Sequence, residues 1–133
     1  MIDRGVNVFS HVMIGLNDVD GSTAFYDSVL SALGYAPCRE DRYYRAYGEP
    51  TGPVMWINQP INGDPATVGN GSMVAMLAES RASVDEAYAS AMAHGGTDEG
   101  APGLRPHYHP DYYGAYFRDP EGNKLCVVCH KSE

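Results

Sequence analysis

The sequence predicts an α+β fold made of two copies of one unit, each consisting of a strand, a helix and three further strands. An apolar strand followed by an amphipathic helix occurs twice along the chain, and a similar turn sequence follows each helix. The length of 133 residues allows one compact domain and argues against two independent cores. With 44% hydrophobic and 20% charged residues, the composition is that of an ordinary globular protein.

The first unit begins with a strand within residues 8–16, a segment rich in Val, Ile and Phe. Asp18 or Asp20 can cap the helix that follows, because a carboxylate at this position accepts hydrogen bonds from the free backbone amides of the first turn. The apolar stripe of this helix ends before Gly34, which is a typical C-terminal stop.

The second unit repeats this order. Residues 72–77 predict a strand, and Ser80 or Ser83 predicts the cap of the next helix. Gly95 is expected to end that helix, as Gly34 ends the first.

An acid-Pro-x-Gly turn follows both helices. The segments 49–57 and 119–127 lie 70 positions apart, and in both the turn leads directly into an apolar strand. Pro pre-sets one backbone dihedral angle of such a turn, and Gly can adopt a positive φ. The aromatic segments 43–47 and 112–117 precede the two turns and complete two hairpins.

Residues 1–133 therefore form a single, internally duplicated domain, with one module at about 6–62 and the other at about 70–131. Neither module alone offers both faces of a core, so the modules are expected to pack together or against a partner chain.

Alternation along the strands predicts which side chains face the helices and which lie on the open face of each sheet. In the last strand, Leu125, Val127 and Cys129 form the covered set, and Cys126 lies on the open face. Asn58 and Leu77 are placed on open faces by the same alternation. The open-face residues expected to contact a ligand are Phe9, His11, Met13, Trp56, Met73 and Cys126.

This duplicated pattern resembles the vicinal oxygen chelate superfamily, which includes glyoxalase I, extradiol dioxygenases, fosfomycin-resistance enzymes and bleomycin-binding proteins. The resemblance rests on His11 in the first strand, on Phe25-Tyr26 in the first helix and on Asp119-Pro120-Glu121-Gly122-Asn123 before the last strand. It implies two βαβββ modules whose mixed sheets curl around a cleft, and this cleft is often completed in a homodimer.

The resemblance also implies where a metal would be held. Members with metal-dependent chemistry hold a divalent cation with His or Glu at four equivalent positions, which are occupied here by His11, Trp56, Met73 and Cys126. Only His11 matches a ligand, because an indole has no lone pair to donate and a thioether is a poor ligand for a hard cation. We therefore predict no metal site and no cofactor.

The segment His107-Tyr108-His109 is a second candidate site. Two histidines at i and i+2 of an extended segment lie on one face and can share a metal, and Pro106 and Pro110 are expected to keep this segment extended. The alternative is a polar loop in which His109 acts as a general base or hydrogen-bond donor above the cleft.

Tyrosine is unusually frequent, with ten residues in the chain. Most of them fit half-buried strands, where tyrosine is favoured. Tyr112 and Tyr116 are predicted on the open face and would form, with Trp56 and Met73, an aromatic cavity that carries His11 as a polar contact. Such cavities bind flat or apolar small molecules.

The charge balance indicates what the protein does not bind. Nine Lys and Arg residues oppose 17 Asp and Glu residues, which gives a formal net charge of -8. A chain of this charge is repelled by nucleic-acid phosphates and by anionic membranes. No apolar run is long enough to span a membrane and no secretory signal is visible, so we expect a cytoplasmic protein.

Three functions remain open at this stage. In the first, a glyoxalase-like protein binds an apolar or aromatic small molecule, and if it is a lyase or isomerase, His11 or His109 is the acid/base and Tyr116 a hydrogen-bond donor. In the second, a metal-dependent lyase or dioxygenase holds its metal with His11 and relocated ligands such as His107, His109 or Cys126. In the third, a dimeric aromatic cleft sequesters a drug, as in resistance-type binding proteins.

Overall fold

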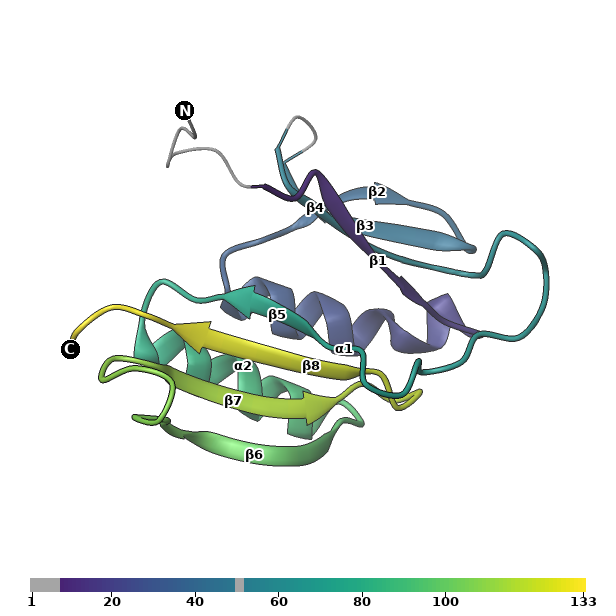
Figure 1. Cartoon of the computed structure of the whole chain (residues 1–133). Coiled ribbons are helices and arrows are strands. Elements are labelled where there is room, and N and C mark those ends of the chain that lie inside the picture. Colours follow the sequence, from purple (N-terminus) through teal and green to yellow (C-terminus); the bar gives the residue numbers. More distant parts are fainter. Residues whose placement is uncertain (1–7, 50–51) are drawn as a thin grey trace.

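The computed structural model describes residues 8–49 and 52–133, and it contains the two helices and eight strands expected from the sequence (Figure 1). The first half contains β1 (His11–Gly15), α1 (Val19–Ala32), β2 (Pro37–Glu40), β3 (Tyr44–Gly48) and β4 (Val54–Asn58). The second half contains β5 (Val74–Leu77), α2 (Arg81–Ala93), β6 (Thr97–Leu104), β7 (Tyr113–Arg118) and β8 (Lys124–Cys129). The predicted α+β class with two βαβββ units is confirmed.

The strands form two open, mixed four-stranded sheets. Sheet A has the order β1-β4-β3-β2 and sheet B the order β5-β8-β7-β6. In each sheet the first strand of the unit runs parallel to the last, and the other neighbours are antiparallel. The module boundaries at 6–62 and 70–131 stay a prediction. Residue 6 lies outside the described residues, as do Pro50 and Thr51 of the first turn.

Both helices begin and end at residues that the sequence indicated. Asp18 caps α1, since its Oδ1 accepts a hydrogen bond from the amide of Gly21 at 2.9 Å. Ser80 caps α2, since its Oγ accepts from the amide of Ser83 at 3.1 Å. Just beyond the helices, Gly34 and Gly95 have φ values of 89° and 93°, which favour glycine.

One hydrophobic core contains side chains from both sheets and both helices, so the two units do pack together. Adjacent residues of α1 reach the two sheets. The Phe25 ring packs on Phe117 of sheet B with ring centroids 6.0 Å apart, and the Tyr26 ring lies 6.5 Å from that of Tyr47 of sheet A. The predicted alternation is confirmed in β4, where Met55 and Ile57 are buried and Trp56 is partly exposed. In β8 both faces are buried, and they include Cys126, which was expected on an open face.

The Asp-Pro-x-Gly-Asn turn between β7 and β8 fastens the two units to each other. The buried carboxylate of Asp119 accepts a hydrogen bond from the Tyr26 hydroxyl at 2.5 Å. It also accepts hydrogen bonds from the backbone amides of Glu121 and Asn123, both at 2.9 Å. The Glu121 carboxylate in turn accepts the backbone amide of Asp18 at 2.8 Å, at the start of α1. This turn, the most specific element of the sequence pattern, therefore stabilises the contact between the two units.

The segment between β6 and β7 differs from the prediction. Residues 106–108 form a turn closed by a hydrogen bond from the amide of Tyr108 to the carbonyl of Arg105 at 3.0 Å. Pro106 occupies the second position of this turn, where its fixed φ is favourable. The expectation that the prolines keep His107-Tyr108-His109 extended was therefore wrong, and the segment forms a loop, as in the alternative prediction.

One outer strand of each sheet is irregular, β2 in sheet A and β6 in sheet B. β2 begins at Pro37 and has a register shift against β3 before Arg39. β6 contains Pro102 and has two register shifts against β7, between Asp98 and Gly103. No helix in the described part of the chain is long and apolar enough to cross a membrane.

Candidate functional site

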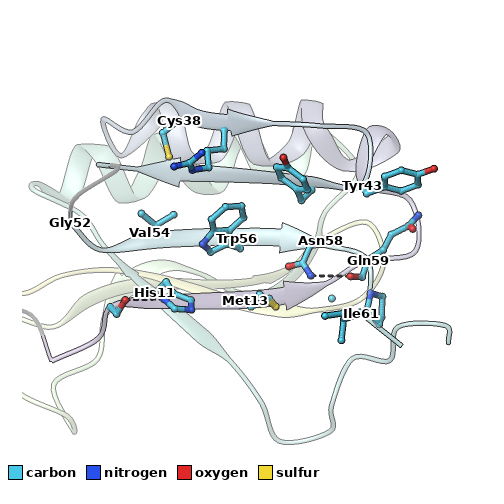
Figure 2. Close-up of a pocket in the computed structure, with 15 residues that line it drawn as sticks. His11, Met13, Cys38, Tyr43, Gly52, Val54, Trp56, Asn58, Gln59 and Ile61 are labelled. Atoms are coloured by element: carbon cyan, nitrogen blue, oxygen red, sulfur yellow. Dashed lines mark hydrogen bonds between the residues drawn. The ribbon is translucent and has the colours of Figure 1, made fainter. Parts of the chain in front are cut away.

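An open cavity with a volume of about 980 Å³ lies on the open face of sheet A (Figure 2). Alternate residues of neighbouring strands point into it, because β1, β4 and β3 are paired in register. The residues that form its floor are His11 and Met13 of β1, Val54, Trp56 and Asn58 of β4, and Tyr44 of β3.

The centre of this cavity is apolar. The Trp56 and Tyr44 rings meet edge to face with centroids 5.8 Å apart, an arrangement that aromatic pairs prefer. Met13 lies beside Trp56 on the neighbouring strand, and its side chain is 59% exposed. An exposed thioether next to an aromatic pair is a surface suited to a flat apolar ligand.

Two polar side chains lie at opposite ends of the floor. His11 Nδ1 is 2.9 Å from the Ser10 hydroxyl, which leaves Nε2 available to a ligand. Asn58 Nδ2 donates to the backbone carbonyl of Gln59 at 2.9 Å, while Asn58 Oδ1 is buried without a hydrogen-bond partner among the described residues. Figure 2 shows both residues at the cavity.

The open face of sheet B carries an aromatic cluster. The Tyr112 and Tyr116 hydroxyls are 2.8 Å apart, and the Tyr112 hydroxyl lies 3.6 Å from Cys126 Sγ. Burial raises the pKa of the Cys126 thiol and also the pKa values of Tyr112 and Tyr116. These three groups are therefore neutral at physiological pH.

Two histidines join the loop before β7 to the end of β8. His109 Nδ1 accepts a hydrogen bond from the amide of Asp111 at 3.1 Å, so its proton is on Nε2. Nε2 then donates to His130 Nδ1 at 2.8 Å. His130 was not among the predicted site residues, because nothing local indicated that the loop would reach it.

The structure divides the predicted site residues between the two sheets. His11, Met13 and Trp56 line the cavity on sheet A, whereas Phe9, just before β1, is exposed outside its lining. Met73 shares with Met13 a smaller hollow between β1 and β5. Tyr116 and Cys126 are in sheet B and His109 is in the loop before β7, and Cys126 is fully buried. The ligand-contacting and catalytic roles of all of these residues stay predictions.

Sequence reasoning overlooked Tyr44 and Arg39, which also line the cavity. Strand register would have indicated both, since Tyr44 is paired with Asn58, and Arg39 is paired with Ala46 opposite Trp56. The pairing of Arg39 was not evident because a bulge before it in β2 interrupts the alternation of side chains along that strand.

The residues at the four family metal positions do not fit a divalent cation. His11 and Trp56 are on sheet A, while Met73 and Cys126 belong to the sheet B side. Only the imidazole of His11 is a good donor, because the Cys126 thiol is buried and neutral. No group of three or more His, Cys, Asp or Glu side chains suitable for a metal occurs within residues 8–49 and 52–133.

Two open βαβββ units with an aromatic cavity on one sheet define a class of small-molecule-binding proteins and enzymes. The sequence profile of the Glyoxalase/Bleomycin resistance protein/Dioxygenase superfamily matches residues 8–127. The chain belongs to this superfamily, as its sequence pattern indicated. Its fold supports a role in small-molecule binding or catalysis.

Solved structures agree with this assignment. A glyoxalase/bleomycin resistance protein from Albidiferax ferrireducens T118 is 42% identical, with a TM-score of 0.84 over 94% of this chain and 100% of that one. A lactoylglutathione lyase from Agrobacterium tumefaciens is 22% identical, with a TM-score of 0.64 over 92% of this chain and 93% of that one, and shares the fold. A glyoxalase-related enzyme from Fulvimarina pelagi is 19% identical, with a TM-score of 0.71 over 93% of this chain and 88% of that one. No curated protein sequence matches the chain.

Proposed function

We propose that the protein binds an apolar or aromatic small molecule on the open face of sheet A without a metal ion. The observation that carries this proposal is the cavity of about 980 Å³ whose floor combines Trp56, Tyr44 and Met13. Its volume lies at the upper end of the range typical of small-molecule sites. The donor set at the family metal positions favours binding that does not use a metal.

His11 is the residue proposed to act on a bound ligand, as a general acid or base. Its imidazole lines the cavity, and Ser10 orients the ring through Nδ1. A lyase or isomerase reaction that moves a proton would use Nε2. The roles predicted for His109 and Tyr116 require that sheet B of a second copy approach this cavity.

A homodimer is part of the proposal. Apolar side chains lie exposed on both open faces, with Met13 at 59%, Leu77 at 57% and Met73 at 43%. A second copy would cover such surfaces and complete the cleft. Light scattering at micromolar concentration tests this, and a strict monomer contradicts it. The cytoplasmic location stays a prediction.

The binding proposal can be tested through Trp56, because the chain contains a single tryptophan. Its indole N–H gives one peak in a ¹H–¹⁵N correlation spectrum, and titration with 2-naphthoate should shift that peak saturably. Met13→Glu should abolish the shift by placing a carboxylate on the cavity floor. Leu104→Glu is the matched control, since Leu104 is 46% exposed on β6, away from the cavity.

An unchanged indole peak with 2-naphthoate, 2-naphthol and (2-naphthyl)methylammonium would refute the proposal. If a ligand is found and is converted, His11→Ala should remove turnover and leave binding measurable.

A further inference from the structure

The cavity on sheet A contains a hydrogen-bond acceptor for which the described part of the chain supplies no donor. This atom is Asn58 Oδ1, which is buried and unpartnered. Its direction is set locally, because the Gln59 carbonyl can only accept and the Asn58 amide must therefore present Nδ2 to it. Figure 2 shows Nδ2 toward Gln59 and the oxygen on the opposite side, over the sheet. Oδ1 has almost no accessible surface, whereas Asn58 as a whole is only partly buried, so a small shift of this side chain would let a bound O–H or N–H group reach the oxygen. Such a contact would remove the cost of an unsatisfied buried acceptor.

The charge on this face contrasts with that of the whole protein. The formal net charge is -8, yet among residues 8–49 and 52–133 no Asp or Glu lines the cavity, and Arg39 is the one lining side chain with a permanent charge. Arg39 is not a member of any ion pair found among the described residues. A guanidinium without a carboxylate partner, in a wall without acids, favours an anionic ligand over a cationic one.

Strand register places these two groups at opposite corners of the aromatic floor. Arg39 is paired with Ala46 of β3, which is in turn paired with Trp56 of β4. Asn58 is two residues beyond Trp56 and opposite Tyr44. Two interstrand spacings and two residues of rise separate the Cα atoms of Arg39 and Asn58 by about 12 Å. Side chains of strands stand roughly perpendicular to the sheet, so this separation is about the span across the floor, which accommodates a molecule of two fused rings.

We propose that the cavity binds an aromatic carboxylate that carries a hydroxyl or N–H group at the end opposite the carboxylate. The rings would pack on Trp56 and Tyr44, the hydroxyl or N–H group would donate to Asn58 Oδ1, and the carboxylate would accept from Arg39. This ligand class deepens the proposed function and rests on it.

Four probes test the proposal on the unaltered full-length chain by calorimetric titration. 6-Hydroxy-2-naphthoate has both groups, 2-naphthoate lacks the donor, 2-naphthol lacks the charge, and (2-naphthyl)methylammonium reverses it. We expect 6-hydroxy-2-naphthoate to bind about tenfold more tightly than 2-naphthoate, the factor expected for one buried hydrogen bond. The ammonium compound should bind most weakly.

Variants assign each preference to its residue. Asn58→Ala should make 6-hydroxy-2-naphthoate and 2-naphthoate bind equally, and Asn70→Ala, an exposed asparagine outside this cavity, should retain the preference. Arg39→Ala should weaken 2-naphthoate about threefold, the scale of an exposed ion pair, and leave 2-naphthol unchanged. Lys131→Ala is the control for the loss of one positive charge, because Lys131 is exposed beyond β8 and does not line the cavity.

The outcomes separate this inference from the proposed function. If all four probes shift the Trp56 indole peak and bind with equal affinity, the site is an aromatic cavity and the ligand class is wrong. If the hydroxyl preference survives Asn58→Ala, the donor is bound elsewhere and the inference fails. A change of oligomeric state in Asn58→Ala, with probe affinities unchanged, would assign Oδ1 to a partner copy and also overturn it. Absence of binding by every probe would refute the proposed function itself.

Discussion

The hydrogen bond between Tyr26 and Asp119 should be worth a measurable part of the stability of the protein. Tyr26→Phe removes only the hydroxyl that donates to the Asp119 carboxylate at 2.5 Å, where both residues are buried. A hydrogen bond to a charged group contributes about 1.5–3 kcal/mol, so we expect the free energy of unfolding to fall by about 2 kcal/mol. Asp119 Oδ2 keeps the Asn123 side-chain amide as a donor at 2.9 Å, which limits the loss.

This change in free energy can be converted into a change in melting temperature. An unfolding entropy of about 2.1 cal/mol/K per residue gives about 0.28 kcal/mol/K for a chain of this length, so Tm should fall by about 7 °C. Urea unfolding followed by circular dichroism gives the free energy, and differential scanning calorimetry gives Tm. Tyr88→Phe is the matched control, because the Tyr88 hydroxyl donates to Asp98 at 2.9 Å in an exposed position. It should change the stability by no more than about 0.5 kcal/mol.

The effect should also depend on pH in a defined direction. Burial, followed by the nearby Asp119 carboxylate, raises the pKa of Tyr26 well above its ordinary value. A group whose pKa is higher in the folded state stabilises fully below its unfolded pKa, about 10 for tyrosine, and loses that contribution as the pH rises further. The stability difference between the wild type and Tyr26→Phe should therefore narrow above about pH 10. Equal stability of the two proteins at pH 7 would refute the reasoning.

Three further predictions concern other parts of the molecule. Burial raises the pKa values of Tyr47 and Tyr112, so the absorbance change at 295 nm that marks their ionisation should coincide with alkaline unfolding. Ionisation of all ten tyrosines with an unchanged circular dichroism spectrum would contradict this. Burial also raises the pKa of the Cys126 thiol. Iodoacetamide at pH 8 should therefore modify Cys126 at least about tenfold more slowly than the partly exposed Cys38. Equal rates for the two cysteines in peptide mass spectrometry would count against this. Gly122 has a φ of 95°, so Gly122→Ala should cost about 1–2 kcal/mol in urea unfolding, and an unchanged midpoint would show that the turn can relax.

Local patterns were sufficient to predict most of the fold. Period-two alternation placed Trp56 and Met13 on the same open face, and the capping preferences of Asp and Ser placed both helix starts within a few residues. These features depend on neighbours in the sequence, and the described structure retains them because covered and open faces of a sheet cannot be exchanged without burying polar groups.

What the sequence could not reveal depends on contacts between distant segments. The turn at 119–123 was recognised as a strand-leading turn, yet its hydrogen bonds to Tyr26 and Asp18 join segments about a hundred residues apart. The unsatisfied oxygen of Asn58 follows from the orientation of one backbone carbonyl, and the His109–His130 pair follows from the path of a turn. Neither leaves a periodic signal in the sequence.

The irregular outer strands limit how copies of this chain can associate. A regular sheet edge presents free backbone amides and carbonyls to which another chain can add, and repeated addition leads to fibres. In β2 and β6 a proline and shifts of register interrupt that row of groups. Growth by strand addition at these two edges is thereby disfavoured. The other edge strand of each sheet, β1 or β5, pairs in regular register, so a chain that adds to either sheet would add there.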